Sequence, residues 1–334
     1  MRSWSLSRRT LLGALAAAAA VVALGCGGDG DGDPVSQTGM PPTSREGADF
    51  PPRPANRSFR DLIGHYREGP VLAPSVGVLE PGENRFGFAL FDRGNRQIGD
   101  LDVALYVAGG VDETAHGPFV ADYRRIEVEP EFVSRNSAQD PDSARSVYVA
   151  EVDFARAGSY LVSAVMMLNG RPVAASPAQV RVAPAREVPG VGDRAVRVHT
   201  PTVASVGGDI DQIETRVPPD SMHEVDLAEA LDRGRPVVLL FATPALCESR
   251  VCGPVTDVAE QVRSEFEDEE VDFIHMEFFE DNDPSKGPRP QVRAWGLVTE
   301  PWLFAIDSDG VVAARLQGAF SPDELRDAVR RALR

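Results

Sequence analysis

The chain has 334 residues, of which 43% are hydrophobic, and its formal net charge is -17 at pH 7. This length exceeds that of one ordinary globular domain, so two domains with packed cores and a non-globular tail are expected. Because phosphate binding requires clustered Lys and Arg, the acidic balance argues against nucleic acid as a partner.

Residues 1–25 have the layout of an export signal. Three arginines precede an apolar run over residues 11–24, which is too short to favour a membrane-spanning helix. The sequence Ala-Leu-Gly-Cys at 23–26 resembles a bacterial lipobox. That resemblance implies a lipoprotein: Cys26 is diacylated, becomes the N-terminus after cleavage and anchors the protein to the extracytoplasmic face of the cell membrane. Ordinary secretory cleavage, with Cys26 incidental, is the alternative.

Residues 26–56 are predicted to be a disordered linker, because they are rich in Gly, Asp, Pro and Ser and have no apolar periodicity. The whole chain has three cysteines, an odd number for an oxidising compartment. If lipid takes Cys26, Cys247 and Cys252 remain. A bridge between two such close residues would remove little entropy from the unfolded chain, so a redox or metal-binding role is favoured.

Residues 57–184 are predicted to form an immunoglobulin-like β-sandwich, because short β-type runs alternate there with turn residues. Asn169-Gly170 predicts a hairpin between the last two runs. The sequence Ala-Gly-Ser-Tyr-Leu-Val at 157–162 also resembles a strand entry of bacterial immunoglobulin-like modules. We infer no chemistry in this region, which is expected to be a spacer or a partner-binding module. The predicted strands are Ser75 to Leu79, Asn84 to Asp92, Leu101 to Ala108, Phe119 to Val128, Ser146 to Phe154, Ser159 to Leu168 and Ala178 to Ala183.

Residues 188–334 are predicted to be a mixed α/β domain, because strand and helix patterns alternate. The continuous apolar run at 237–241 is typical of a central strand covered on both faces. Apolar residues between 255 and 266 recur at helical spacing. The remaining predicted elements are strands over 271–279, 302–306 and 311–316, a short helix before residue 302, and a closing helix that begins with the capping box Ser-Pro-Asp-Glu at 321–324.

The order of elements over residues 188–334 resembles the thioredoxin superfamily, and two motifs carry the resemblance. The sequence Phe-Ala-Thr-Pro-Ala-Leu-Cys at 241–247 stands where that family ends its central strand and presents its nucleophilic cysteine. The sequence Trp-Gly-Leu-Val-Thr-Glu-Pro at 295–301 resembles the segment that ends in the family's cis-proline. The resemblance implies a thioredoxin-like fold in which Cys247 and Cys252 are redox-active and Pro301 is cis.

The cysteine spacing departs from the C-x-x-C of that family, because four residues separate the thiols in Cys-Glu-Ser-Arg-Val-Cys. On one continuous helix, five steps would place the two Cα atoms about 8.6 Å apart. A disulfide needs less than about 7 Å. If the pair bridges, Cys247 must therefore lie in a loop folded back on a helix that begins near Cys252.

Two further departures bear on the mechanism. Leu240 occupies the position where thioredoxins commonly bury an acid, so that proton-relay group is missing. Glu300 precedes the expected cis-proline, and a carboxylate there would raise the pKa of a nearby thiol. Arg250, inside the cysteine loop, would offset part of this effect by favouring a thiolate.

The leading functional hypothesis is thiol–disulfide exchange with thiols or disulfides of exported proteins, which would make the chain a thiol–disulfide oxidoreductase without metal or other cofactor. Three alternatives stay open. Pro244 and Ser-Arg-Val-Cys at 249–252 resemble the peroxiredoxin pattern, with one residue too many and Ser in place of Thr. Copper-delivering SCO-type proteins share the fold and use two cysteines and a distant His, for which His275 is the candidate. The last alternative is a non-catalytic binding domain with a structural disulfide.

Overall fold

The computed structural model describes residue 50 and residues 57–184 and 188–334, which all belong to one compact unit. The predicted signal, Cys26 and nearly all of the predicted linker lie outside these described residues. Within the described ranges, no helix combines the length and the apolar character needed to cross a bilayer. The domain boundaries expected from the sequence stay predictions.

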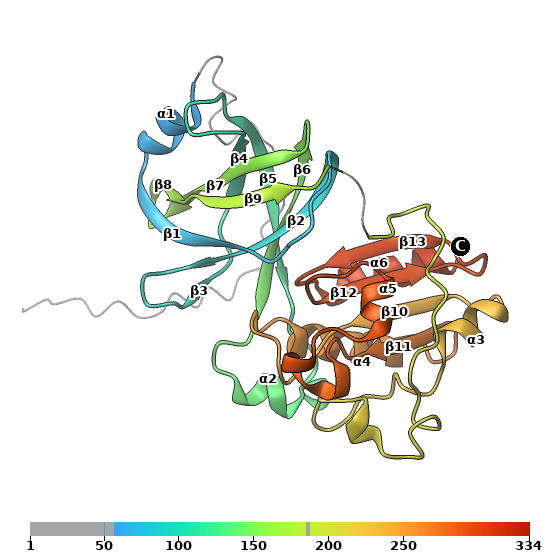
Figure 1. The fold of residues 1–334 in the computed structure, drawn as a ribbon. Helices are drawn as coiled ribbons and strands as arrows, with labels where there is room; N and C mark the ends of the chain where they lie inside the picture. The colour runs from blue at the N-terminus through green and yellow to red at the C-terminus, as the bar shows by residue number, and fades with distance from the viewer. Residues whose placement is uncertain (1–49, 51–56, 185–187) are drawn as a thin grey trace, which may run out of the picture. The chain divides into compact units, whose positions relative to one another are not determined.

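The strands between residues 67 and 182 form one sheet that closes on itself (Figure 1). They are β1 (Arg67–Pro74), β2 (Gly82–Phe91), β3 (Gln97–Ile98), β4 (Val103–Ala108), β5 (His116–Arg125), β6 (Ser146–Phe154), β7 (Gly158–Leu168), β8 (Arg171–Ser176) and β9 (Ala178–Val182). Seven strands follow one another round the barrel in the order β1-β8-β7-β4-β5-β6-β2. The barrel is closed by β1, which pairs in parallel with β8 and antiparallel with β2.

Side chains alternate between the inside and the outside of this barrel, as they must along a β-strand. In β4, Val103 and Leu105 belong to the interior cluster. The intervening Ala104 and Tyr106 pack on the outside, against helix α1 (Phe59–Gly64). Both faces of β4 are therefore buried, which explains why all six of its residues are fully enclosed.

The closed barrel overturns the predicted immunoglobulin-like sandwich, because a sandwich consists of two sheets with free edges. β1 and β8, the two strands that complete the ring, were not among the predicted strands. Each contains proline, which weakens a strand pattern. The hairpin at Asn169-Gly170 does form, and both residues have positive φ (50° and 71°). However, it joins β7 to β8 and not to the strand over 178–182.

A second, four-stranded sheet lies in the C-terminal half in the order β11-β10-β12-β13. Its strands are β10 (Val237–Phe241), β11 (Asp272–Met276), β12 (Trp302–Ile306) and β13 (Val312–Gln317). β10 and β11 are parallel, whereas β12 pairs antiparallel with both β10 and β13. The α-helices nearby in the chain are α2 (Arg135–Gln139), α3 (Leu227–Asp232), α4 (Cys252–Glu265), α5 (Pro290–Ala294) and α6 (Pro322–Ala332). Short 3-10 helices are η2 (Pro130–Phe132), η3 (Ile210–Gln212), η4 (Glu280–Asn282) and η5 (Pro284–Lys286).

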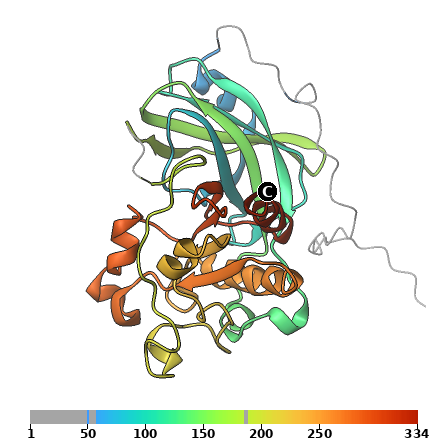
Figure 2. The same cartoon turned by 90° about the vertical axis from the view of Figure 1, so that its right-hand side faces the viewer.

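Both faces of the second sheet are covered (Figure 2). Val238 and Leu240 of β10 pack in a cluster with apolar residues of α4 and α6. Val237 and Leu239 pack on the other face with residues of α3 and α5. This double coverage is the physical reason for the continuous apolar run of β10. The strand over 237–241 and the capping box of α6 are confirmed.

The predicted fold class as a whole is nevertheless wrong. The regular structure of the described residues is mostly sheet, with a closed barrel and additional strands, and a separate thioredoxin-like α/β domain is not evident among them. One reason is that the core does not divide between two halves: Ile126, Val147 and Val149 from the barrel strands and the loop after β5 share a cluster with α4 and α6. This shared cluster joins the barrel to the C-terminal elements within one unit.

Polar contacts also join the barrel to the C-terminal elements. The Arg85 side chain pairs with Glu324 at 2.8 Å and donates to the carbonyl oxygens of Gln317 and Ala319. Its side chain is only 15% exposed, so this pair is less screened by water than a surface pair. These contacts join β2 of the barrel to the end of β13 and the start of α6.

Candidate functional site

Cys247 and Cys252 form a disulfide, with their Cα atoms 5.9 Å apart. Cys252 is the first residue of α4, and Cys247 lies in the loop before it. The loop turns back at Arg250, which has a positive φ of 57° and donates its backbone N–H to the Cys247 carbonyl. The deduction that a bridged pair requires a folded-back loop before a helix is therefore confirmed.

The two bridged cysteines differ in exposure. Cys252 is fully buried in the cluster between the sheet and α4. Cys247 is only partly buried, and its Sγ lies 3.1 Å from the Ser249 hydroxyl oxygen. Because Cys252 begins a helix of 14 residues, the positive end of the helix dipole favours negative charge on its sulfur. A thiolate of a partner can therefore attack the sulfur of Cys247, and the negative charge then develops on the sulfur of Cys252.

Glu300 lies beside this disulfide and precedes Pro301 by a cis peptide bond, as expected. A carboxylate oxygen of Glu300 and the two sulfurs all lie within 4.8 Å of one another. Burial raises the pKa of Glu300 to about 8, although hydrogen bonds with Thr243 oppose the shift. At neutral pH this group is therefore mainly a neutral carboxylic acid, and the predicted charge against a thiolate develops only in alkaline solution.

A second buried acid lies near Glu300. Leu240 is buried and apolar, as the sequence indicated. Glu277, which follows β11, has its pKa raised to about 7, mainly because it is buried. Its carboxylate accepts from the Thr215 hydroxyl at 2.8 Å, and the same Thr215 oxygen accepts the backbone N–H of Ala245 in the cysteine loop. Glu300 therefore lies beside the sulfurs, and Glu277 is linked to the cysteine loop through Thr215.

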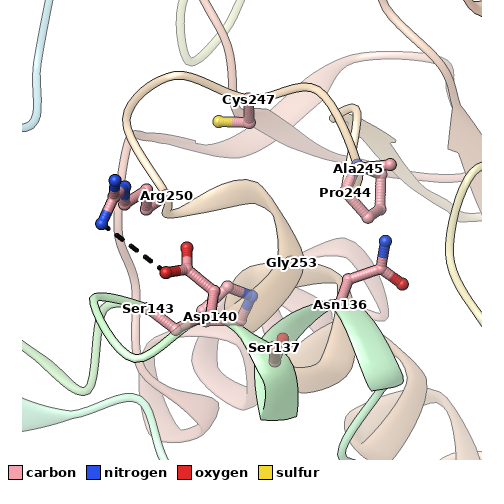
Figure 3. A pocket seen from close by; sticks show the side chains of 10 residues that line it. Asn136, Ser137, Asp140, Ser143, Pro244, Ala245, Cys247, Arg250 and Gly253 are labelled. Atoms are coloured by element: carbon pink, nitrogen blue, oxygen red, sulfur yellow. Dashed lines mark ion pairs between the residues drawn. The ribbon is translucent and has the colours of Figure 1, made fainter.

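A small pocket of 150 Å³ opens next to Cys247 (Figure 3). One wall is the cysteine loop with Pro244 and Arg250, and the other wall is the segment between β5 and β6, with Asn136 and Asp140. The Arg250 guanidinium pairs with Asp142 and lies 3.6 Å from Asp140. The predicted thiolate-stabilising residue therefore lies in the site, with its charge engaged by carboxylates of this segment.

The segment over residues 126–145 is held in place by a buried ion pair. Arg216 and Asp257 are 4% and 3% exposed, and their side chains approach to 2.9 Å. Arg216 also donates to the carbonyl oxygen of Phe132, and Asp257 accepts from the backbone N–H of Ser134. No chemistry was predicted for residues 57–184, although this region forms a polar wall of the pocket beside Cys247. A loop between two strands carries no sequence signal for such a contact.

His275, the alternative metal ligand, is buried on β11 away from the sulfur pair. Its Nδ1 lies 2.8 Å from an Asp220 oxygen and its Nε2 lies 3.0 Å from the Ala242 carbonyl oxygen. Among the described residues, the groups able to hold a metal ion place His275 with Glu214, Asp220 and His223, and place the two cysteines with Glu300. The proposed set of two cysteines and His275 is therefore not brought together. His223 was not among the predicted site residues, although the sequence Asp-x-x-His at 220–223 places an acid and a histidine close together.

No protein-family model and no curated protein matches the chain. Among solved structures, the chain is similar to a thiol:disulfide interchange protein, a thioredoxin-family protein from Chlorobium tepidum TLS. The sequence identity is 18% and the TM-score is 0.29, and the match covers 45% of this chain and 99% of that chain. This likeness is partial and covers fewer than half of the residues of the chain.

Proposed function

We propose that the chain is a thiol–disulfide oxidoreductase that exchanges electrons with exported proteins through Cys247 and Cys252. The observation that carries this proposal is the unequal exposure of the bridged sulfurs. A partly exposed Cys247 admits an attacking thiolate, while the fully buried Cys252 begins a long helix. A disulfide that only stabilised the fold would gain little from so short a loop.

The reaction follows the usual course of thiol–disulfide exchange. A partner thiolate attacks Sγ of Cys247, the bond between the two protein sulfurs breaks, and its electron pair passes to Sγ of Cys252. The second partner thiol then attacks the mixed disulfide and releases Cys247. The partner is oxidised to a disulfide and the protein is reduced to a dithiol; the reverse sequence reduces a partner disulfide.

Glu300 supplies the proton for the buried sulfur in this scheme. Its carboxyl is protonated at neutral pH and lies within 4.8 Å of the Cys252 sulfur. A neutral acid can give its proton to the leaving thiolate, which would otherwise be a buried charge without a counterion. In the reverse direction the ionised carboxylate takes the proton back from Cys252.

The partner is expected to enter at the pocket beside Cys247, whose walls present Asn136, Asp140 and Arg250. These side chains offer hydrogen-bond donors and acceptors to the backbone of a peptide next to the reacting sulfur. The partners in the proposal are thiols or disulfides of proteins outside the cytoplasm.

The location in the proposal rests on Cys26. A lipid on this residue would hold the protein at the extracytoplasmic face of the membrane, where disulfides persist. We expect a Cys26→Ala variant to lose lipid labelling and to move from the membrane fraction to the soluble fraction. Unchanged membrane partition of this variant would contradict the anchor.

The exchange is tested with a reduced peptide dithiol and the oxidised full chain. After acid quenching and alkylation, mass spectrometry should count one protein disulfide lost for each peptide disulfide formed, while circular dichroism shows a folded chain. The Cys247→Ser and Cys252→Ser variants are the matched controls and should oxidise no peptide to its disulfide. A protein disulfide that reacts only after unfolding in urea would refute exchange and favour a structural bridge.

A further inference from the structure

Four buried side chains converge behind the cysteine loop, outside the exchange site. They are Glu214, Asp220, His223 and His275, and we name them the His–carboxylate cluster. Their side chains are 1%, 0%, 2% and 0% exposed. One nitrogen or oxygen atom of each lies within 4.8 Å of the corresponding atoms of the other three. Two imidazoles and two carboxylates are a donor set that suits divalent transition metals.

Four nitrogen–oxygen distances within the cluster are near the edge length of a tetrahedral coordination sphere, with Asp220 turning one oxygen toward each histidine. Nε2 of His223 lies 3.0 Å from Glu214 Oε2 and 3.5 Å from Asp220 Oδ1. Nδ1 of His275 lies 2.8 Å from Asp220 Oδ2 and 3.5 Å from Glu214 Oε2. Ligand atoms at about 2.0 Å from a tetrahedral ion are separated from one another by about 3.3 Å. An ion at the centre would therefore require only small movements of these side chains.

Each imidazole turns one nitrogen toward the carboxylates of the cluster. The Ala242 carbonyl oxygen lies 3.0 Å from Nε2 of His275, so Nε2 carries the proton and Nδ1 can direct a lone pair into the cluster. His223 directs Nε2 into the cluster, and its Nδ1 has no hydrogen-bond partner among the described residues.

The carboxylates are fixed from behind by the backbone. Glu214 accepts the N–H of Arg216 at 2.7 Å, and Asp220 accepts the N–H of Met222 at 2.9 Å. Such outer contacts hold ligating carboxylates in a set orientation. Glu214, Asp220 and His223 come from one irregular segment, and these contacts fix the orientation of its two carboxylates.

The charges of the cluster also favour a bound cation. Glu214 and Asp220 are a pair of buried carboxylates, and in the described part of the chain their ion pairs are all with the two histidines. The nearest guanidinium in the sequence, Arg216, is engaged by Asp257 and by backbone carbonyls. Burial of a carboxylate without a positive partner is costly, and a divalent cation bound by this pair would supply one.

We infer that Glu214, Asp220, His223 and His275 bind one divalent transition-metal ion, with Zn²⁺ the best fit to two nitrogens and two oxygens in a closed tetrahedral site. The ion would have a structural role, since four protein ligands leave no open position for a substrate. It would fix residues 213–223, which contact the cysteine loop through Thr215 and the segment between β5 and β6 through Arg216. The site is independent of the sulfur pair and of the proposed exchange.

The test is metal analysis of the folded full chain in its oxidised form, in which the disulfide removes both thiols as ligands. We expect about one equivalent of Zn²⁺ per chain after dialysis against Zn²⁺ and gel filtration. Exchange for Co²⁺ should give the strong visible absorption of a tetrahedral site. His223→Ala should lose the bound metal, whereas His199→Ala, which removes an exposed histidine that also faces an aspartate, should keep it.

Two further measurements keep the inference falsifiable if His223→Ala does not fold. The wild-type chain should show a higher Tm with Zn²⁺ than after treatment with a chelator. A Cys247→Ser, Cys252→Ser double variant should hold the same amount of metal. A folded wild-type chain that binds below about a tenth of an equivalent of Zn²⁺ or Co²⁺ would overturn the inference and leave a hydrogen-bonded cluster of histidines and carboxylates. Loss of the metal in the double variant alone would move the site to the sulfurs and would likewise overturn it.

Discussion

Replacement of Glu300 by glutamine should change how the stability of the oxidised protein depends on pH. Glu300 is held in the folded protein with its pKa raised from 4.5 to about 8, mainly by burial. The folded state therefore binds this proton more tightly than the unfolded state. The stability that this group contributes is complete below pH 4.5 and is lost as the pH rises through about 8.

The linkage relation sets the size of the effect. Each unit of difference between folded and unfolded pKa is worth about 1.4 kcal/mol, so the interval from 4.5 to about 8 gives at most about 5 kcal/mol. Part of the titration of the unfolded chain lies below pH 5, so we expect wild-type protein to lose between about 2 and 4 kcal/mol more than Glu300→Gln between pH 5 and pH 9. The nearby Glu277 and His275 titrate in both proteins and largely cancel in the comparison.

The assay is equilibrium urea unfolding of wild type and Glu300→Gln at pH 5 and pH 9, with the disulfide intact. Glu267→Gln is the matched control, because that side chain is 60% exposed and its loss should leave the pH dependence unchanged within about 0.5 kcal/mol. Equal losses in wild type and Glu300→Gln would refute the reasoning, because Glu300 would then ionise at the same pH in the folded and unfolded chains.

Three other substitutions test the packing that positions the site. Arg216→Met should cost about 3 to 5 kcal/mol in urea unfolding because it leaves the Asp257 carboxylate buried without its partner, whereas Arg330→Met at an exposed pair should cost less than about 1 kcal/mol. Gly318→Ala should destabilise the protein far more than Gly310→Ala. Both glycines have positive φ, but only at residue 318 would the new Cβ lie 1.8 Å from the Ser75 carbonyl oxygen. Equal Tm values of the two variants would contradict this contact between the barrel and the second sheet. Ser321→Ala should lower the stability by about 1 kcal/mol through loss of the α6 cap, and an unchanged midpoint of unfolding would show that the cap is not needed.

The C-terminal elements could be predicted because their signals are local. The apolar run of β10, the capping box at Ser321 and the helical spacing after Cys252 each depend on neighbours in the sequence. The folded-back cysteine loop followed from helix geometry alone, since five helical steps hold two Cα atoms too far apart for a bridge. Positions of Pro301 and Glu300 beside the sulfurs came from a resemblance to known proteins.

The barrel could not be predicted because its closure is not local. β1 meets β8 about a hundred residues later in the chain, and neither strand has a clean alternating pattern. The polar wall beside Cys247 depends on contacts that are just as distant in the sequence, such as that of Ser134 with Asp257. The His–carboxylate cluster was missed for a similar reason: His275 lies on a strand more than fifty residues after Asp220.

The central claim is that Cys247 is the sulfur that partners attack, and its most direct test uses single-cysteine variants. The folded Cys252→Ser and Cys247→Ser variants are mixed with glutathione disulfide, and the formation of the mixed disulfide is followed by mass spectrometry. We predict that the partly exposed Cys247 in Cys252→Ser reacts at least about tenfold faster than the buried Cys252 in Cys247→Ser. Equal rates in the two variants, or faster reaction at Cys252, would contradict the account.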